Sequence, residues 1–407
     1  MKLNRGIYAI IGVIVLVFAG VIYAWSVLAS PIAAFFSDWT KAQLSLTFTI
    51  CMVFFCLGGV LGGFLSRKFS ARVILWTAGL MFLVGFYMTS VAQSLPVLYV
   101  GYGFLGGLAS GLSYNRVLST VLAWFPEKQG LLSGILLMGF GIGSFLIGKV
   151  YQAVTPGGAD LEVWRTSFAV FAVILFIILF ISGLLLKNPT ADTVLPQAAE
   201  KKRGAGNAGE ITEELTAGNM MKRPIFWVHF LWSFVLSAAG LALIAQASGL
   251  IVEVNPAAVG GTIATAAGII SIFNGIGRVI FGGLFDRIGY QKTKLLINAT
   301  FIVAVVLLLF SISTKSFVLL VLGYMATGLG YGGVPPTNSA FSSLFFGRKN
   351  FPVNLSIVNL NLLFASFGGT VAGALFDSTQ SYFTTLIFMA AAILIGCVAS
   401  IRLKRNA

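Results

Sequence analysis

Long apolar segments follow one another along almost the whole chain, separated by short polar breaks. A helix needs about 20 apolar residues to cross the hydrocarbon layer of a membrane, and these segments reach that length. Charged residues, prolines and asparagines mark the breaks. The pattern predicts an all-α membrane protein with twelve spans, at 6–30, 44–66, 73–93, 96–124, 131–151, 166–187, 224–252, 258–285, 295–313, 317–345, 353–376 and 382–402.

The composition supports a membrane protein. Of the 407 residues 58% are hydrophobic and 9% are charged, whereas soluble domains carry about 25% charged residues. The 47 glycines often stand at small-xxx-small spacing, as in Gly58-Gly59 with Gly62-Gly63, which lets helices approach closely in lipid. We therefore expect a packed helical bundle. The three cysteines form no CxxC or Cys/His pattern, so we expect no metal and no cofactor.

The placement of the charges predicts the orientation of the chain. There are 26 Lys and Arg against 12 Asp and Glu, for a net charge of +14. Most of the basic residues fall in one set of connections, while Lys41, Arg165 and Lys315 stand in the opposite set. By the positive-inside rule both termini are cytoplasmic. The basic excess then reflects topology in an inner or plasma membrane, and we expect no nucleic-acid partner.

One long polar stretch divides the chain. Residues 188–223 read as a cytoplasmic linker between two bundles of six helices, at 1–187 and 224–407. Glycine and tyrosine positions repeat between the halves, as at Gly101-Tyr102 and Gly323-Tyr324, which lie 222 residues apart. This parallel repeat is typical of transporters that move two bundles about a central site.

Two arginines are predicted at membrane depth, Arg116 and Arg278, whereas no span centre carries a carboxylate. Embedded cations are costly and usually face a cavity or a partner. A small organic anion would supply the missing negative charge, and guanidinium binds carboxylate by two parallel hydrogen bonds. Two structural alternatives stay open: Arg278 can instead bond main-chain carbonyls, and Arg116 can extend to the cytoplasmic interface.

The single histidine, His229, is a candidate proton relay or a packed core residue.

Enzyme chemistry finds no support. The chain has no HExxH, no nucleotide-binding P-loop and no pair of embedded carboxylates. The pattern favours a secondary transporter over an enzyme or an ATP-driven pump.

One loop carries the first family resemblance. Residues 282–289 read GGLFDRIG, which resembles the loop signature of the major facilitator superfamily. The resemblance implies two six-helix bundles, alternating access, and a gating role for Gly283, Asp286 and Arg287. The related stretch after Gly62-Gly63 carries Arg67 where an acid is expected. In this superfamily the acid of the loop helps to close the cytoplasmic gate, so the resemblance does not extend this role to the N-terminal half.

More specifically, the chain resembles the oxalate/formate antiporter family, which is related to monocarboxylate transporters. The resemblance rests on GVIYAWS at 20–26, WFPEK at 124–128, RPIFW at 223–227, FNGIGR at 273–278, PPTN at 335–338 and RKNF at 348–351. It implies that Arg278 binds a substrate carboxylate and that two tyrosines line the cavity. The candidate substrate-binding set is Arg278, Tyr114, Tyr331, Asn115, Arg116, Asn361 and Tyr23.

The departures from the family bear on the substrate and on coupling. Asn361 stands where the oxalate exchanger has a lysine, so one fixed cation remains, which suits a monocarboxylate such as lactate, pyruvate, formate or acetate. Arg116 can restore a second charge, which would favour a dicarboxylate:monocarboxylate exchanger. Asn274 replaces the aspartate that monocarboxylate transporters carry four residues before the arginine. Proton symport would then use the substrate or His229.

The leading hypothesis is a monomeric, proton-coupled carrier of small organic anions. The alternatives are an anion exchanger and, from another class, a transporter-like ligand sensor.

Overall fold

The computed structural model describes all residues except 1–3, 156–161, 191–192, 194–213, 259 and 402–407. The described residues form helices and connecting turns and contain no β-strand. Ten helical segments are long and apolar enough to cross a membrane, and a shorter apolar helix follows near the C-terminus. The all-α prediction is confirmed.

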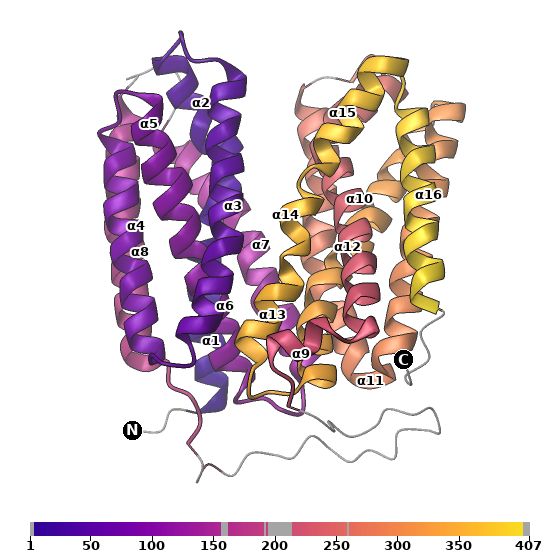
Figure 1. Ribbon diagram of the computed structural model, residues 1–407. Coiled ribbons are helices and arrows are strands. Elements are labelled where there is room, and N and C mark those ends of the chain that lie inside the picture. The colour runs from indigo at the N-terminus through magenta and orange to yellow at the C-terminus, as the bar shows by residue number, and fades with distance from the viewer. Residues whose placement is uncertain (1–3, 156–161, 191–192, 194–213, 259, 402–407) are drawn as a thin grey trace. The chain divides into compact units, whose positions relative to one another are not determined.

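The first half of the chain holds the first six predicted spans (Figure 1). Spans one and four are interrupted helices, broken by a 3-10 turn, η1, and by a π-helical stretch, η2. In chain order the elements are α1 (Arg5–Ala19), η1 (Gly20–Ala24), α2 (Trp25–Phe35), α3 (Lys41–Leu65), α4 (Ala71–Ser90), α5 (Leu95–Leu98), η2 (Tyr99–Gly106), α6 (Gly107–Leu122), α7 (Gln129–Val154) and α8 (Val163–Leu185).

The second half holds the other six spans. Span eleven is broken twice, and spans eight and nine run on as one element. The elements are α9 (Ala217–Met221), α10 (Pro224–Val254), α11 (Gly260–Thr314), α12 (Phe317–Phe346), α13 (Phe351–Asn359), α14 (Asn361–Ala365), α15 (Gly368–Thr379) and α16 (Tyr382–Ile401).

A sharp kink inside α11 separates the predicted spans 258–285 and 295–313. Gly289 has φ 81° and ψ 175°, a conformation outside the helical region. Glycine adopts positive φ without the steric cost that a Cβ imposes. The chain therefore turns between two spans at Gly289. With α11 counted as two spans, the described helices agree with the predicted count of twelve.

Part of the predicted linker is helical. Thr216 caps α9 by accepting a hydrogen bond from the Asn219 N–H. Just before it, the Glu214 carboxylate accepts hydrogen bonds from the main-chain N–H groups of Arg348 and Lys349, at 3.1 and 2.8 Å. These contacts fix this part of the segment against the residues after α12, and the linker bounds of 188–223 stay a prediction. Most of the remaining linker, 194–213, lies outside the described residues.

The chain divides into two compact units, unit 1 (1–126, 139–197 and 351–356) and unit 2 (127–138, 198–350 and 357–407). The predicted boundaries at 187 and 224 stay a prediction. Two short segments group differently from that prediction: 127–138, at the start of α7, belongs to unit 2, and 351–356, at the start of α13, belongs to unit 1.

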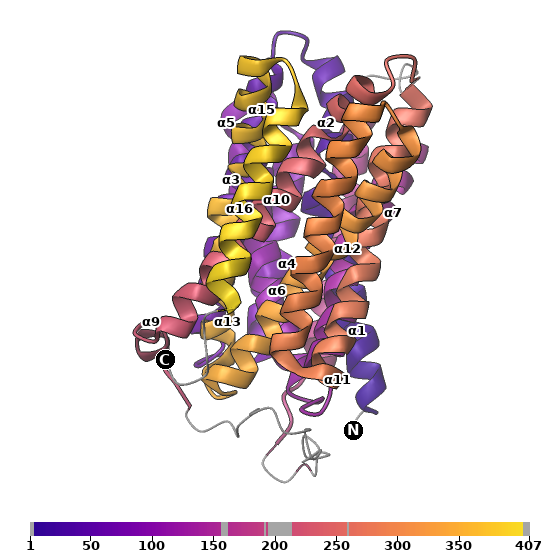
Figure 2. The ribbon, with the colours of Figure 1, turned by 90° about the vertical axis from the view of Figure 1, so that its right-hand side faces the viewer.

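Within unit 1 the helices pair closely, α3 against α6 and α4 against α8. Within unit 2, α11 packs along α12, and α10 lies against α16 (Figures 1 and 2). Each unit contains a similar buried hydrogen bond from a tyrosine. The Tyr102 hydroxyl donates to the Ile22 carbonyl at 3.0 Å, and the Tyr324 hydroxyl, 222 residues later, donates to the Ala247 carbonyl at 2.6 Å. The sequence repeat thus has a structural counterpart.

Glycines set the closest helix contacts of both units. A Cβ at Gly111 would overlap the Phe55 carbonyl, and a Cβ at Gly143 would overlap the carbonyl of Val17. In unit 2 a Cβ at Gly277 would overlap the carbonyl of Leu329. The small-residue spacing in the sequence therefore reflects backbone-to-backbone packing, as expected for helices in lipid.

We predict that Gly111→Ala lowers the stability of the purified protein, by about 1–3 kcal/mol, because overpacking forces the helices apart. The measurement is thermal unfolding in detergent. Gly59→Ala is the matched control, because nothing lies within 4 Å of a Cβ at Gly59. Equal midpoints for the two variants would contradict the packing argument.

Candidate functional site

Arg278 is held by two hydrogen bonds but keeps an uncompensated charge. Its side chain on α11 is half-buried. The Nε group donates to the Asn274 carboxamide oxygen at 3.0 Å, and Nη1 donates to the main-chain oxygen of Leu137. The described residues offer it no carboxylate partner. The two bonds fix the orientation of the guanidinium, and its remaining N–H groups are available to an anion.

The backbone around Arg278 is tightly packed inside unit 2. A Cβ at Gly134 of α7 would overlap the Arg278 carbonyl, and a Cβ at Gly332 of α12 would overlap the Asn274 carbonyl. Two helices therefore touch α11 at the level of Arg278, where close packing limits its movement. The arginine is a fixed feature of this unit.

Tyr331 lies next to this contact on α12. It directly precedes Gly332, is 7% exposed, and its ring packs where a Cβ at Gly240 of α10 would stand. Unit 2 thus brings together three residues that the sequence analysis singled out: Arg278, Asn274 and Tyr331. A phenol beside a guanidinium can hydrogen-bond a carboxylate while its ring forms an apolar wall.

Tyr23 and Tyr114 share an aromatic cluster in unit 1. Phe140 lies 5.4 Å from Tyr23 and 5.3 Å from Tyr114, between ring centroids. Phe55 joins both tyrosines, at 6.4 and 5.4 Å. The interrupted first span places Tyr23 in the 3-10 turn η1, where the ring leaves the regular helical register. Their role as substrate contacts stays a prediction.

The two predicted asparagines have structural bonds. The Asn115 amide donates to the Pro352 carbonyl at 2.8 Å within unit 1. The Asn361 amide donates to the Val358 carbonyl at 2.6 Å, across the break between α13 and α14. In both side chains the carboxamide oxygen is buried without a hydrogen-bond partner among the described residues. Each oxygen remains an acceptor for a bound hydroxyl or water.

Asp286 caps another helix. Its two carboxylate oxygens accept hydrogen bonds from the main-chain N–H groups of Gly130 and Leu131, at 2.9 and 2.8 Å. Those N–H groups belong to the first turn of α7, where a negative charge is favourable. Gly282 approaches so closely that a Cβ there would overlap the Gly130 carbonyl. The signature loop of unit 2 therefore binds the N-terminus of α7 through Asp286, and we call this contact of Asp286 with Gly130 and Leu131 the Asp286 clasp. The neighbouring Arg287 is exposed.

The related loop in unit 1 keeps the glycine but not the clasp. A Cβ at Gly63 would lie 2.7 Å from the Pro352 carbonyl at the start of α13. Counted from the glycine pair, the residue at the position of Asp286 is Ser66, which corrects the placement of Arg67 at the position of the acid. The Ser66 hydroxyl donates back to the Gly62 carbonyl at 2.6 Å, and Arg67 is exposed. Neither side chain gives α13 an anionic cap.

A buried polar chain in unit 2 was missed by the sequence analysis. Lys294, which the charge count placed in a cytoplasmic connection, is 4% exposed. Its ammonium donates to the Tyr290 hydroxyl at 2.9 Å and lies 4.6 Å from the centre of the Trp232 ring. The Tyr290 hydroxyl lies 3.2 Å from His229 Nδ1. The signal in the sequence was the spacing of Tyr290, Lys294 and Asn298, which places them on one helical face.

The hydrogen bonds of this chain point in one direction. The Asn338 amide donates to the Ser233 hydroxyl at 2.8 Å, so its oxygen accepts from His229 Nε2 at 3.0 Å. His229 Nδ1 is then an acceptor for the Tyr290 hydroxyl, whose oxygen accepts from Lys294. His229 is therefore both packed, against the Phe341 ring at 3.7 Å between centroids, and part of a Lys294–Tyr290–His229–Asn338 polar chain. Its role as a proton relay stays a prediction.

Comparisons with known proteins point to one family. A family model described as Major Facilitator Superfamily matches residues 10–361. The oxalate:formate antiporter of Oxalobacter formigenes is 27% identical over 86% of this chain and 80% of its own. Monocarboxylate transporter 13 of Rattus norvegicus is 25% identical over 93% of this chain and 83% of its own.

Solved structures agree on the fold. The proton:xylose symporter XylE superposes with a TM-score of 0.72 at 13% identity, over 98% of this chain and 95% of its own. The fucose:proton symporter FucP of E. coli superposes with a TM-score of 0.68 at 16% identity, over 98% of both chains.

We predict that Asp286→Ala destabilises the protein by about 0.5–2 kcal/mol, the usual cost of losing a helix cap. The carboxylate supplies two hydrogen bonds to α7 that alanine cannot replace. Thermal unfolding in detergent measures the loss. Ser66→Ala, which removes only a bond within its own helix, is the control and should have a smaller effect. A larger effect in the control would contradict the assignment of the clasp to Asp286.

Proposed function

This chain belongs to the major facilitator superfamily, and we propose that it carries small monocarboxylates such as lactate, pyruvate, formate or acetate in symport with protons. It is a multi-pass membrane transporter and not an enzyme. The proposal covers the chemistry of the substrate, the residues that bind it, and the source of coupling.

The observation that carries the substrate proposal is the state of Arg278. Two hydrogen bonds orient its guanidinium, and both acceptors, Asn274 and the Leu137 carbonyl, are neutral. The net positive charge therefore remains for a ligand. A carboxylate meets that charge and pairs with the planar N–H fork.

A monoanion suits this site better than a dianion. Asn361 supplies a neutral carboxamide where the resembling exchanger family has a lysine, so Arg278 is the one fixed cation of the predicted substrate set in unit 2. Tyr331 next to it offers a hydroxyl and an apolar ring. The relatives named for oxalate, formate and monocarboxylates support a carboxylate substrate of this size.

Coupling is proposed to use the polar chain of unit 2. Asn274 cannot take up a proton, so the residue beside Arg278 does not supply the coupling group. His229 can accept a proton at Nδ1 from the Tyr290 hydroxyl, while Lys294 returns a proton to Tyr290. Each of these transfers follows a hydrogen bond of 3.2 Å or less.

Anion exchange is the second candidate function. The similarity to an oxalate:formate antiporter favours it, and so does the neutral Asn274. In an exchanger the return of the carrier to its starting conformation is coupled to a second substrate molecule, and the Lys294–Tyr290–His229 chain would serve packing alone.

The proposal of a monocarboxylate symporter includes three further assignments: alternating access gated by the Asp286 clasp, cytoplasmic termini, and a monomer.

We predict that Arg278→Gln abolishes saturable uptake of labelled monocarboxylate into proteoliposomes. Arg278→Lys should keep part of it, because the charge remains but the two-pronged contact is lost. Lys292→Gln is the control, since this exposed lysine lies on the same element. Wild-type uptake by Arg278→Gln, with a normal thermal midpoint, would contradict the substrate proposal.

A separate prediction tests coupling. Lys294→Gln and Tyr290→Phe should lose uptake driven by an imposed pH gradient but keep counterflow of labelled against unlabelled substrate, which needs no net proton movement. Lys292→Gln should keep both activities. If wild-type protein ignores the pH gradient, symport is wrong and exchange is the better account. If the wild type responds and the variants respond equally, the polar chain is not the coupling path.

A further inference from the structure

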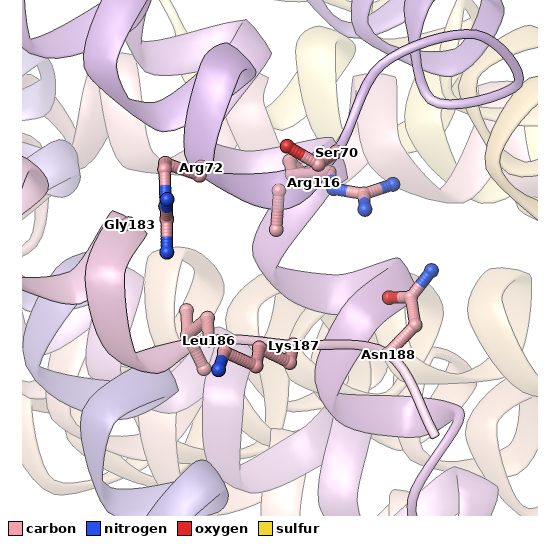
Figure 3. Close-up of a pocket in the computed structure, with 8 residues that line it drawn as sticks. Ser70, Arg72, Arg116, Gly183, Leu186, Lys187 and Asn188 are labelled. Atoms are coloured by element: carbon pink, nitrogen blue, oxygen red, sulfur yellow. The ribbon is translucent and has the colours of Figure 1, made fainter. Parts of the chain in front are cut away.

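Unit 1 has a cationic site of its own, at one end of its helices. A pocket of about 410 Å³ opens where α4 begins and α8 ends. Figure 3 shows three basic side chains around it: Arg72 from α4, Arg116 from α6, and Lys187 just after α8. The distribution of basic residues predicts that this end of the bundle is cytoplasmic.

Arg116 is the buried member of this cluster. Its side chain is 3% exposed, and its Nε has no hydrogen-bond partner in the part of the chain that the structure describes. The described residues also offer its guanidinium no ion pair. A buried charge without a partner costs several kcal/mol by the usual order of magnitude. The position therefore calls for an anion that is not part of the described chain.

Another arginine in the same unit shows how the fold satisfies such a group. Arg165 donates to the carbonyls of Ser90 and Ala92, each at 3.0 Å, and stands 3.8 Å from the Glu162 carboxylate. Arg116 has no equivalent of these contacts. Unit 1 thus supplies carbonyl and carboxylate partners to Arg165, whereas the described residues supply none to the guanidinium of Arg116.

The start of α4 adds to the positive field of the pocket. Ser70 caps this helix, and Ser70 and Ala71 both line the pocket. The first N–H groups of a helix have no intrahelical acceptor and attract anions. No acidic residue is among the described residues that line the pocket. Three basic side chains and a helix N-terminus therefore line one pocket.

We propose that this pocket binds a phosphate oxyanion, with Arg116 as its buried ligand and with Arg72, Lys187 and the first turn of α4 around it. Guanidinium groups and helix N-termini together are a common way to hold phosphate. The phosphate can belong to an anionic phospholipid or be free in solution. Val73 and Leu184, which follow the lining residues Arg72 and Gly183 in the sequence, are exposed apolar side chains; they favour the lipid, because they offer a surface to acyl chains near these helix ends.

The test is binding by purified protein, with two arms that separate the sources. In the lipid arm, native mass spectrometry compares retention of phosphatidylglycerol with that of phosphatidylcholine. In the solution arm, a thermal-shift titration in neutral lipid uses inorganic phosphate. We expect the wild type to bind in at least one arm, and Arg116→Gln to weaken that binding about tenfold, the effect of losing one charge-assisted hydrogen bond.

Two further variants make the result decisive. Arg72→Gln removes an exposed cation of the pocket and should also weaken binding, without the folding risk of a change in the interior. Lys68 lies in the turn just before α4 and does not line the pocket. Lys68→Gln removes an equal charge there, and this variant should bind as the wild type does. Loss in the lipid arm alone identifies a headgroup, and loss in the solution arm alone identifies a free anion.

Equal binding by the wild type and Arg116→Gln in both arms would overturn the proposal. So would an Arg116→Gln variant that binds phosphate and lipid normally but loses monocarboxylate binding. That outcome would make Arg116 a substrate ligand. Neither result depends on whether Arg278 binds the substrate.

Discussion

Contact between helix backbones at glycine is the constraint on which the rest of this structure depends. In lipid, apolar side chains gain nothing by leaving their surroundings, so helices associate where their surfaces fit closely. Here glycines bring main chains together at α3 and α6, at α11 and α12, and at the start of α7. The same contacts place the functional groups. Gly134 and Gly332 both touch the stretch of α11 that carries Asn274 and Arg278, so the cation is positioned by packing.

A second constraint is electrostatic. The described spans contain buried cations at Arg116, Lys294 and, half-buried, Arg278, whereas the acids lie at helix ends and in connections. The three cations have different kinds of neighbours. Arg278 is oriented by neutral acceptors, Lys294 is stabilised by a phenol and an indole ring, and Arg116 faces a pocket. A neutral partner fixes direction without cancelling charge, which is a way to hold a site ready for an anion.

The sequence predicted the spans well because a helix that crosses a membrane must be long and apolar. It also singled out Arg278, since a charge in an apolar segment is easily recognised. It missed Lys294, because the polar residues before 295 were interpreted as a connection between spans. In the structure the turn lies at Gly289, which has a positive φ, and Lys294 is part of the helix that follows. The clasp at Asp286 joins residues 156 positions apart, and such pairings depend on how helices pack. The same is true of the pocket at Arg116, which needs the ends of α4 and α8.

The internal repeat puts different side chains at one equivalent position of the two halves. At the spacing of 222 residues, Arg116 matches Asn338. In the second half, the Asn338 oxygen accepts a hydrogen bond from His229, so this position is satisfied by the protein itself. In the first half, Arg116 lines a pocket, and its Nε has no hydrogen-bond partner among the described residues. The same position of the repeat therefore makes an internal contact in one half and borders an open pocket in the other.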